Sequence, residues 1–195
     1  MHSLPKATLR AHYKQKRQRL PQTTQEHAAQ RIVGELITHP VYLRAKHLAV
    51  YHAIPGEVDV SRLIQDAFER GITCYMPAIA LDKTLFFLPY TQDSPTQLNA
   101  FNIPEPIGAL SAAQPIEAID LMIVPLVAFD LHGTRLGLGG GYYDRTLGHA
   151  RPHCLLGVAF SVQEHMLLPK DAWDVNVDGV ITEQGIQWFK KTCYT

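Results

Sequence analysis

The segment from Leu121 to Phe129 is a nearly continuous apolar run of strand length. A strand with one face in water alternates polar and apolar side chains, and this segment does not. The run therefore predicts a central strand in a sheet whose two faces are both covered by other elements.

A second segment predicts how the sheet is connected. His47 to Ala53 has the composition of a strand, and residues 60–68 carry an apolar stripe at helical spacing. Gly71 would close that helix, and Ile72 to Met76 is again strand-like. A strand–helix–strand crossover implies parallel strands. We therefore predict a single α/β domain over residues 1–195, a three-layer, Rossmann-like arrangement with a mostly parallel sheet and helices on both faces.

The same patterns predict the rest of the chain. The expected elements are a helix over residues 4–20, a helix capped by Thr23 and Glu26 and ended by Pro40, a strand from Leu85 to Tyr90, loops over 91–118, a helix from about Tyr142 to Gly148, a strand from Leu155 to Phe160, a short helix from Ser161 through Leu168, a strand from Val177 to Thr182 and a closing helix from Glu183 to Lys191.

Charge is balanced overall but uneven along the chain. Eighteen Lys and Arg match eighteen Asp and Glu, yet six of the basic residues fall between Lys6 and Arg19, before the first acidic residue, Glu26. Lys6, Arg10, Lys14 and Arg17 would share one face of the first helix. Such a face is either solvated or binds an anion.

Composition also bears on the compartment. The three cysteines, Cys74, Cys154 and Cys193, have no disulfide or zinc spacing, which favours a reducing environment. No apolar run reaches the length of a membrane span. The basic N-terminus would suit an organelle transit peptide, but its helical pattern favours a cytoplasmic protein.

The segment Gly137–Leu138–Gly139–Gly140–Gly141 is the strongest chemical signal. It follows a buried strand and opens a helix, where free backbone N–H groups can bind phosphate. The segment is neither a Walker A motif nor a full dinucleotide fingerprint. A flexible turn is the alternative, and we favour an anion site.

Polar residues near this loop are candidate ligands. Asp144 could hold Mg²⁺ against bound phosphates or only favour the helix dipole. Arg135 and Arg145 flank the loop and could meet phosphate charge or be surface cations. Asp174 and Asp178 could add a metal carboxylate, although their local pattern is that of turn and cap residues.

A second group of candidates suits an organic ligand. Glu57 follows the first strand and could accept hydrogen bonds from a polar heterocycle, although a solvated loop carboxylate is the simpler interpretation. Phe101 could stack on a flat ring or plug the base of its loop. His52 has the pattern of a packed strand histidine. No metalloprotease, serine-nucleophile or Cys–His signature is present, so covalent catalysis lacks a sequence signal.

These pieces, in this order, resemble the 5-formyltetrahydrofolate cyclo-ligase family, also called methenyltetrahydrofolate synthetases. The segments that carry the resemblance are Lys6-x-x-x-Arg10, Pro55-Gly56-Glu57-Val58-Asp59, Asn102-Ile103-Pro104-Glu105-Pro106, Val124 to Asp130, Gly133 to Arg145 and Trp173-Asp174-x-x-Val177-Asp178. The resemblance covers nearly the whole chain, and the glycine block is its most specific part.

The resemblance implies an activity in one-carbon metabolism. It implies a ligase that converts 5-formyltetrahydrofolate to 5,10-methenyltetrahydrofolate while ATP becomes ADP and phosphate, with Mg²⁺ required. Phosphorylation of the formyl oxygen would be followed by attack of N10.

The resemblance also implies roles for individual residues. It places ATP at Lys6, Arg10, Arg135, Leu136, Gly137, Leu138, Gly139, Gly140, Gly141, Tyr142 and Tyr143. It places the folate at His52, Glu57 and Leu138 to Tyr142, to which we add Phe101. It places Mg²⁺ at Asp144 and Asp174, and we expect Tyr142 and Arg145 to be catalytic.

Two alternatives stay open from the residues alone. A sugar-phosphate isomerase or CoA-transferase-like enzyme would tolerate a glycine-rich anion loop, but its own catalytic carboxylate motif is missing. A non-catalytic anion-binding module could use the basic helix, but the balanced net charge argues against a nucleic-acid partner. We expect a monomer that binds neither nucleic acid nor membrane.

Overall fold

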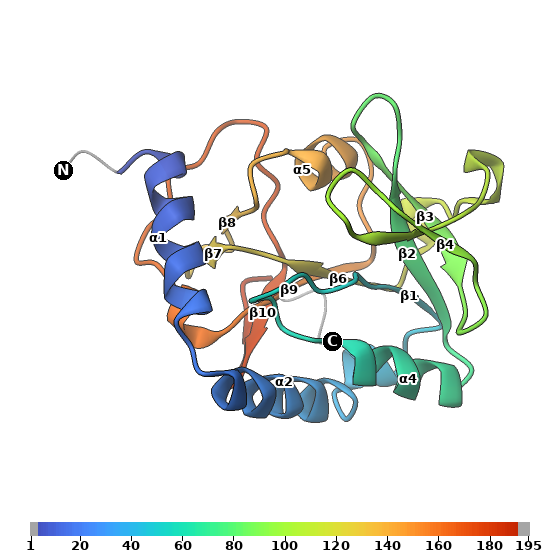
Figure 1. Cartoon of the computed structure of the whole chain (residues 1–195), viewed down its shortest axis with the longest axis horizontal. Coiled ribbons are helices and arrows are strands. Elements are labelled where there is room, and N and C mark those ends of the chain that lie inside the picture. The colour runs from blue at the N-terminus through green and yellow to red at the C-terminus, as the bar shows by residue number, and fades with distance from the viewer. Residues whose placement is uncertain (1–3, 191–195) are drawn as a thin grey trace.

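A seven-stranded sheet forms the centre of the protein in the computed structural model, which describes residues 4–190 (Figure 1). Its strand order is β11-β10-β9-β6-β1-β2-β3. The strands are β1 (His47–Ala49), β2 (Thr73–Ile79), β3 (Leu85–Tyr90), β6 (Leu121–Pro125), β9 (Cys154–Val158), β10 (Gly179–Thr182) and β11 (Gly185–Trp188). Neighbours from β10 through β2 are parallel, and the edge strands β3 and β11 are antiparallel. The predicted mostly parallel α/β sheet is confirmed.

Helices cover both faces of this sheet. On one face lie α2 (Gln22–Leu36), α3 (Pro40–Leu43) and α4 (Ser61–Glu69), whose apolar stripes pack on the sheet. Figure 1 shows α2 and α4 below the sheet and α5 (Tyr142–Leu147) above it. Helix α4 ends before Gly71, which has a φ of +71° as a C-terminal cap requires.

Helix α1 (Lys6–Gln18) lies at the side of the sheet. Its residues Leu9 and Tyr13 are buried against Val127, Ala128 and Leu136. Because these apolar residues occupy one side of the helix, a basic side is left to face elsewhere in the molecule.

The predicted strand from Leu121 to Phe129 is divided in two. Strand β6 ends at Pro125, and β7 (Ala128–Phe129) pairs with β8 (Arg135–Leu136) in a separate ribbon. The Leu126 carbonyl accepts hydrogen bonds from Gln163 and Arg17 rather than from a strand. The apolar run predicted burial correctly, but burial alone does not reveal where the chain leaves the sheet.

The predicted closing helix is wrong over its described part, because residues 185–188 form β11 and pair antiparallel with β10. Gly185 has a φ of +123°, which turns the chain back on itself. The partly buried Ile186 and Trp188 then pack on the main core. Pairing with an exposed sheet edge outweighs helical propensity in so short a segment. Lys191 lies outside the described residues.

Smaller boundaries also differ from the predictions. Strand β1 stops at Ala49, whereas β2 runs past Pro77 to Ile79, beyond its pairing with β1. Helix α2 begins after Pro21, so Thr23 lies inside the helix and makes no cap. The predicted helix from Ser161 is a single 3₁₀ turn. The loop region 91–118 contains β4 (Thr96–Leu98), β5 (Pro104–Pro106) and the 3₁₀ turns η1 (Leu110–Ala112) and η2 (Ile116–Ala118), and the Ser161 turn is η3 (Ser161–Gln163).

Within residues 4–190, no helix is both long enough and apolar enough to span a bilayer. Cys74 is a buried free thiol, Cys154 is also buried, and Cys193 lies outside the described range.

Asp130 holds the corner between β7 and β8, and this leads to a stability prediction. Its fully buried carboxylate accepts hydrogen bonds from the backbone N–H groups of His132, Thr134 and Leu168 at 2.9–3.0 Å. Asp130→Ala leaves these donors without their acceptor, so the free energy of unfolding should fall by about 3 kcal/mol or more. Urea denaturation measures the loss. Asp82→Ala is the control, because it removes a comparable turn carboxylate from an exposed hairpin. Equal destabilisation of the two variants would contradict this account.

Candidate active site

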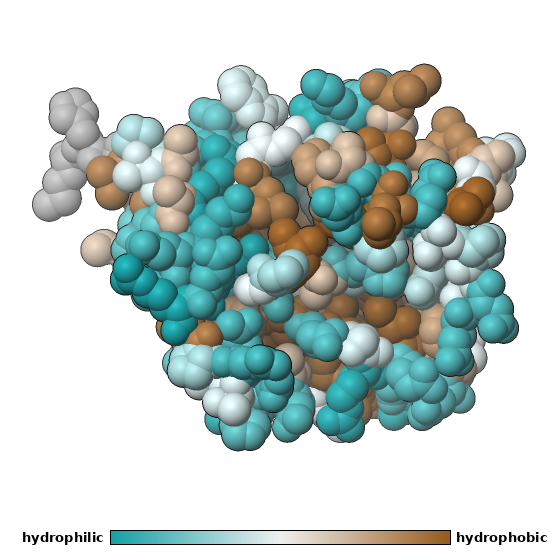
Figure 2. All heavy atoms as spheres, viewed as in Figure 1, coloured by the Kyte–Doolittle hydropathy of each residue, from teal (hydrophilic) through white to brown (hydrophobic). Residues whose placement is uncertain are grey.

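A cavity of about 1020 Å³ opens at the carboxyl edge of the sheet. Tyr51 and His52, which follow β1, and Pro125 and Leu126, at the end of β6, form its floor. Helix α1, residues 99–105, the glycine loop with α5, and residues 171–174 form its walls. In Figure 2 a hollow with hydrophobic residues lies between the hydrophilic surface of α1 and the loops opposite. Ligands of open α/β sheets bind at this edge.

The glycine loop allows other groups to approach its backbone closely. Gly139 and Gly141 have φ values of +110° and +70°, which residues with side chains rarely adopt. A Cβ atom at Gly139 would lie 3.5 Å from the Arg10 guanidinium, and one at Gly141 would lie 3.0 Å from Arg145. The missing side chains therefore leave room for arginines at the loop as well as for a ligand.

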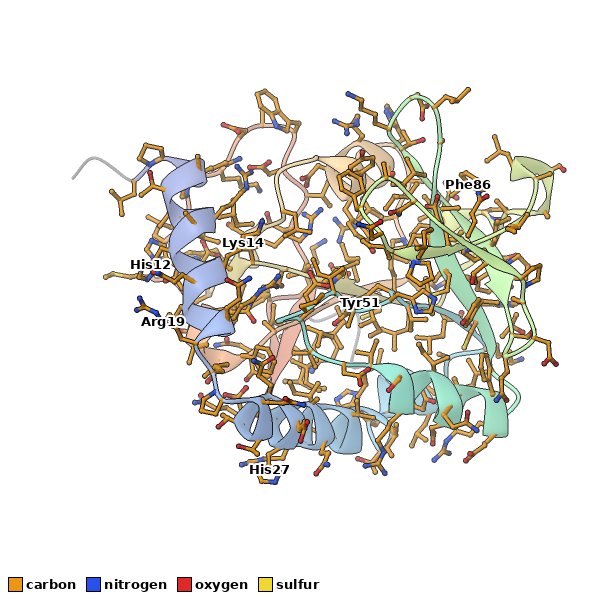
Figure 3. All side chains as sticks on the ribbon, in the orientation of Figure 1. His12, Lys14, Arg19, His27, Tyr51 and Phe86 are labelled. Carbon is orange, nitrogen blue, oxygen red and sulfur yellow. The ribbon has the colours of Figure 1, made fainter. Side chains whose placement is uncertain are left out.

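Helix α1 brings positive charge to this loop. Lys6, Arg10 and Lys14, spaced four residues apart, all line the cavity. The Nε atom of Arg10 donates a hydrogen bond to the Gly137 carbonyl at 3.0 Å. Figure 3 shows Lys14 projecting from α1 toward the centre of the molecule, where Tyr51 lies. The basic helix and the glycine loop, to both of which the resemblance assigns ATP, thus lie together in the structure.

Asp144 and Asp174 lie on adjoining walls. Asp144 Oδ1 is 2.9 Å from Arg135 Nη2 and accepts the Val175 N–H at 3.1 Å. Asp174 pairs with Lys6 and accepts the Asp171 N–H at 2.7 Å. Each carboxylate is thus paired with a cation, and each accepts a hydrogen bond from a backbone N–H group within residues 171–175.

The Lys6 ammonium group bridges two carboxylates, those of Asp171 and Asp174. Partial burial alone would lower the pKa of Lys6, but the two carboxylates hold that pKa above its usual value. Lys6 therefore stays charged, and it fastens the start of α1 to the 171–174 loop.

This arrangement fits a magnesium ion that arrives with phosphate. Among residues 4–190, no three His, Cys, Asp or Glu side chains form a cluster able to hold a metal alone. Mg²⁺ usually takes one or two carboxylates and completes its shell with phosphate oxygens and water. Asp144 and Asp174 match that incomplete donor set.

Asp178 belongs to a different place. Its carboxylate is buried, accepts the Leu155 N–H at 2.8 Å, and pairs with Arg151 and Lys190. It does not line the cavity. Of the two aspartates that the sequence left open as a second metal ligand, only Asp174 is near Asp144.

The far end of the cavity carries a buried carboxylate. The Glu57 side chain is 5% exposed and accepts the Ile54 N–H at 3.3 Å. Burial raises the pKa of Glu57, and the nearby Arg17 guanidinium opposes that rise. Burial also lowers the pKa of His52, whose Nε2 atom is buried without a hydrogen-bond partner. This end can therefore offer an acceptor and an imidazole to a polar ring.

Aromatic rings lie between the two ends. Phe101 and Tyr142 meet edge to face, with their centroids 5.8 Å apart. Arg145 lies over the Tyr142 ring at 5.5 Å and donates hydrogen bonds to the carbonyls of Gly140 and Lys83. These contacts give a flat ligand an aromatic surface next to the glycine loop.

All but one of the predicted site residues line this single cavity. Leu136 is the exception, because its side chain is buried with Leu9 and Tyr13 in the core under α1. Sequence reasoning assigned no role to several other lining residues, Lys14, Asn99, Glu105, Asp171 and Trp173. Lys14 carried a signal in its place on the basic face of α1, and Glu105 and Trp173 stand in segments that carry the family resemblance.

The chain matches known proteins along most of its length. The model of the 5-formyltetrahydrofolate cyclo-ligase family matches residues 2–183. The Escherichia coli K12 protein named 5-formyltetrahydrofolate cyclo-ligase is 32% identical, over 90% of this chain and 99% of its own. The Haemophilus influenzae protein of that name is 35% identical, over 77% and 83% of the two chains. The structure of Aquifex aeolicus 5,10-methenyltetrahydrofolate synthetase superposes with a TM-score of 0.85 at 31% identity, covering 96% of this chain and 94% of its own.

Arg145 fastens the glycine loop to the β2–β3 hairpin, and this contact can be tested without a ligand. Arg145→Gln removes the donors to Gly140 and Lys83. We expect amide hydrogen exchange over residues 137–141 to become at least several-fold faster, because the loop then opens more often. Arg62→Gln, on the other side of the sheet, serves as the charge-matched control. Unchanged exchange in Arg145→Gln would mean that the loop holds its shape without this contact.

Proposed function

The chain belongs to the 5-formyltetrahydrofolate cyclo-ligase family, and on this basis we propose that it converts 5-formyltetrahydrofolate to 5,10-methenyltetrahydrofolate at the expense of ATP, with Mg²⁺ required. One observation carries the proposal. A single cavity has cations, a glycine loop and two carboxylates at one end, a buried carboxylate at the other, and aromatic rings between them. Family membership argues against an isomerase, a transferase or a non-catalytic module.

The size of the cavity supports two ligands at once. Small-molecule sites typically enclose about 300–1,000 Å³. The volume here is about 1020 Å³, at the upper limit of that range. We therefore propose that a nucleoside triphosphate and the reacting part of a folate share this one space.

The chemistry needs such an arrangement. A formyl amide is a poor electrophile because nitrogen donates electrons to the carbonyl carbon. Transfer of the γ-phosphoryl group to the formyl oxygen forms a P–O bond as the bond to ADP breaks. N10 then attacks the same carbon, N10 loses its proton, and the formyl oxygen leaves as part of inorganic phosphate. Such a sequence depends on position and charge neutralisation and needs no protein nucleophile.

Residue roles follow from place in the cavity. Lys6, Arg10 and the backbone of residues 137–141 would bind the phosphates, helped by Arg135 and Arg145. Glu57 and His52 would hold the polar ring of the folate, with Phe101 and Tyr142 packed on its faces.

Asp144 and Asp174 would hold Mg²⁺, which when bound neutralises charge on the transferring phosphoryl group. Their present partners are cations, so each carboxylate would exchange an Arg135 or Lys6 contact for the metal. Lys6 would then be free to pair with phosphate. The proposed site calls for no group from a second subunit, and we propose a monomeric enzyme.

The activity can be tested directly. Purified protein with 5-formyltetrahydrofolate and Mg²⁺ should produce the methenyl chromophore only when ATP is added, with one ADP formed per methenyl group. A non-hydrolysable ATP analogue and removal of Mg²⁺ with a chelator are the controls. Folded protein that gives no ATP-dependent absorbance would contradict the proposed function.

Three aspartate variants test the metal site. Asp144→Asn and Asp174→Asn each remove an anionic ligand of the proposed Mg²⁺ ion, so turnover should fall on the order of a hundredfold and the Mg²⁺ concentration for half-maximal rate should rise. Asp178→Asn should lower the melting temperature, because it weakens a buried network, yet leave the Mg²⁺ requirement unchanged. A wild-type Mg²⁺ requirement in Asp144→Asn, or a shifted one in Asp178→Asn, would remove the basis for this assignment.

A further inference from the structure

Arg17 is the member of the basic face of α1 that does not line the cavity. Its side chain is 3% exposed, whereas Lys6, Arg10 and Lys14 reach the cavity itself. A buried guanidinium cannot contact a phosphate that binds in the cavity. Arg17 therefore requires an explanation different from that of its neighbours.

Arg17 connects three segments behind the cavity floor. Its Nη1 atom donates to the Leu126 carbonyl at 3.3 Å, where the chain leaves β6. Its Nη2 atom is 3.6 Å from Glu57 Oε1. Gly56, with a φ of +84°, turns the chain so closely that a Cβ atom there would lie 3.6 Å from Arg17 Nε. The helix, the end of β6 and the Glu57 turn thus meet at one guanidinium.

This placement is energetically costly. The Nε atom of Arg17 is buried and has no hydrogen-bond partner. An unsatisfied buried donor destabilises the fold, and a buried ion pair seldom contributes more stability than an apolar pair of equal size. The stability of the fold therefore does not explain why residue 17 is an arginine. A need to keep the Glu57 carboxylate charged does explain it.

The surroundings of Glu57 support that interpretation. Burial raises the pKa of Glu57, and the guanidinium of Arg17, the Ile54 N–H and, more weakly, Lys14 oppose the rise. Tyr51 and Tyr143 also lie near this carboxylate, and burial raises the pKa of each phenol, so both stay neutral. Arg17 is thus the largest positive influence on a carboxyl group that burial alone would tend to protonate.

We propose that Arg17 is a positioning residue, which keeps Glu57 ionised and aimed into the cavity so that its carboxylate accepts hydrogen bonds from N–H groups of the folate ring. The proposal rests on the proposed function, because it assumes that the folate ring occupies the Glu57 end. Arg17 touches no substrate and acts only through Glu57.

The first test measures the Glu57 carboxyl group without any substrate. In protein labelled with ¹³C-glutamate, the Glu57 signal is assigned by its loss in Glu57→Gln and is followed against pH. Arg17→Gln should raise the Glu57 pKa by about one unit or more, while Arg17→Lys should leave it near the wild-type value. Arg19→Gln is the matched control, because Arg19 is exposed and points away from the molecule in Figure 3.

The second test separates the two substrates. Arg17→Gln should raise the KM for 5-formyltetrahydrofolate up to about tenfold over wild type at pH values below the Glu57 pKa, the equivalent of a one-unit pKa shift, and leave the KM for ATP within about twofold. The folate KM should rise further as the pH falls, because protonated Glu57 cannot accept two N–H donors. Arg17→Lys should restore the pH profile. Adding Arg17→Gln to Glu57→Gln should cause no further loss, since Arg17 acts through Glu57.

The outcomes are distinguishable. An unchanged Glu57 pKa in Arg17→Gln, or equal increases in the two KM values, overturns the positioning role. If Arg17→Gln fails to fold, Arg17→Lys provides the test instead. This variant keeps the positive charge, so a shifted pH profile of its folate KM would contradict the proposed role of that charge. A wild-type protein with no turnover but a clear pKa change in Arg17→Gln contradicts the proposed function and still supports the coupling of Arg17 to Glu57.

Discussion

The docking of helix α1 beside the carboxyl edge of the sheet is the interaction on which the cavity depends. Leu9 and Tyr13 are buried against Val127, Ala128 and Leu136, and each large apolar side chain contributes about 1.5–3 kcal/mol. The partly exposed pair of Lys6 with Asp171 contributes at most about 1 kcal/mol. The apolar side therefore sets where α1 lies, and the basic side, once placed, supplies charge to a glycine loop that has little of its own.

Desolvation is the second constraint. Asp144 with Arg135 and Glu57 with Arg17 are ion pairs with at least one partner almost fully buried, and such pairs repay their burial only with good geometry. Each pair stands at one end of the cavity, where the proposed reaction needs charge. At the end proposed for phosphate, the cations would offset negative charge directly. At the other end Arg17 acts on the Glu57 carboxylate, which in turn would contact the folate ring.

The fold explains why one cavity can serve two ligands. The end of β1, the end of β6 and the start of α5 meet at the same edge of the sheet, and the 99–105 segment and the 171–174 loop close the sides. The groups that we propose for binding the ring and the phosphates thus stand at one edge of the same sheet. That arrangement suits a reaction in which a phosphoryl group must reach one oxygen atom on a neighbouring molecule.

The sequence by itself determined the α/β class, the buried central strand and the glycine loop, because apolar periodicity and glycine runs are local signals of burial and of close backbone approach. It misjudged residues 183–190, because residues 185–188 fold back on β10 as a hairpin, and β10 offers that edge only once it is paired with the more distant β9. Only the tertiary structure decided that Lys6 meets Asp174, that Asp178 lies apart from Asp144, and that Arg17 lies behind Glu57. Charge pairs and cavity walls join segments that are distant in sequence, and no local pattern encodes which segments will meet.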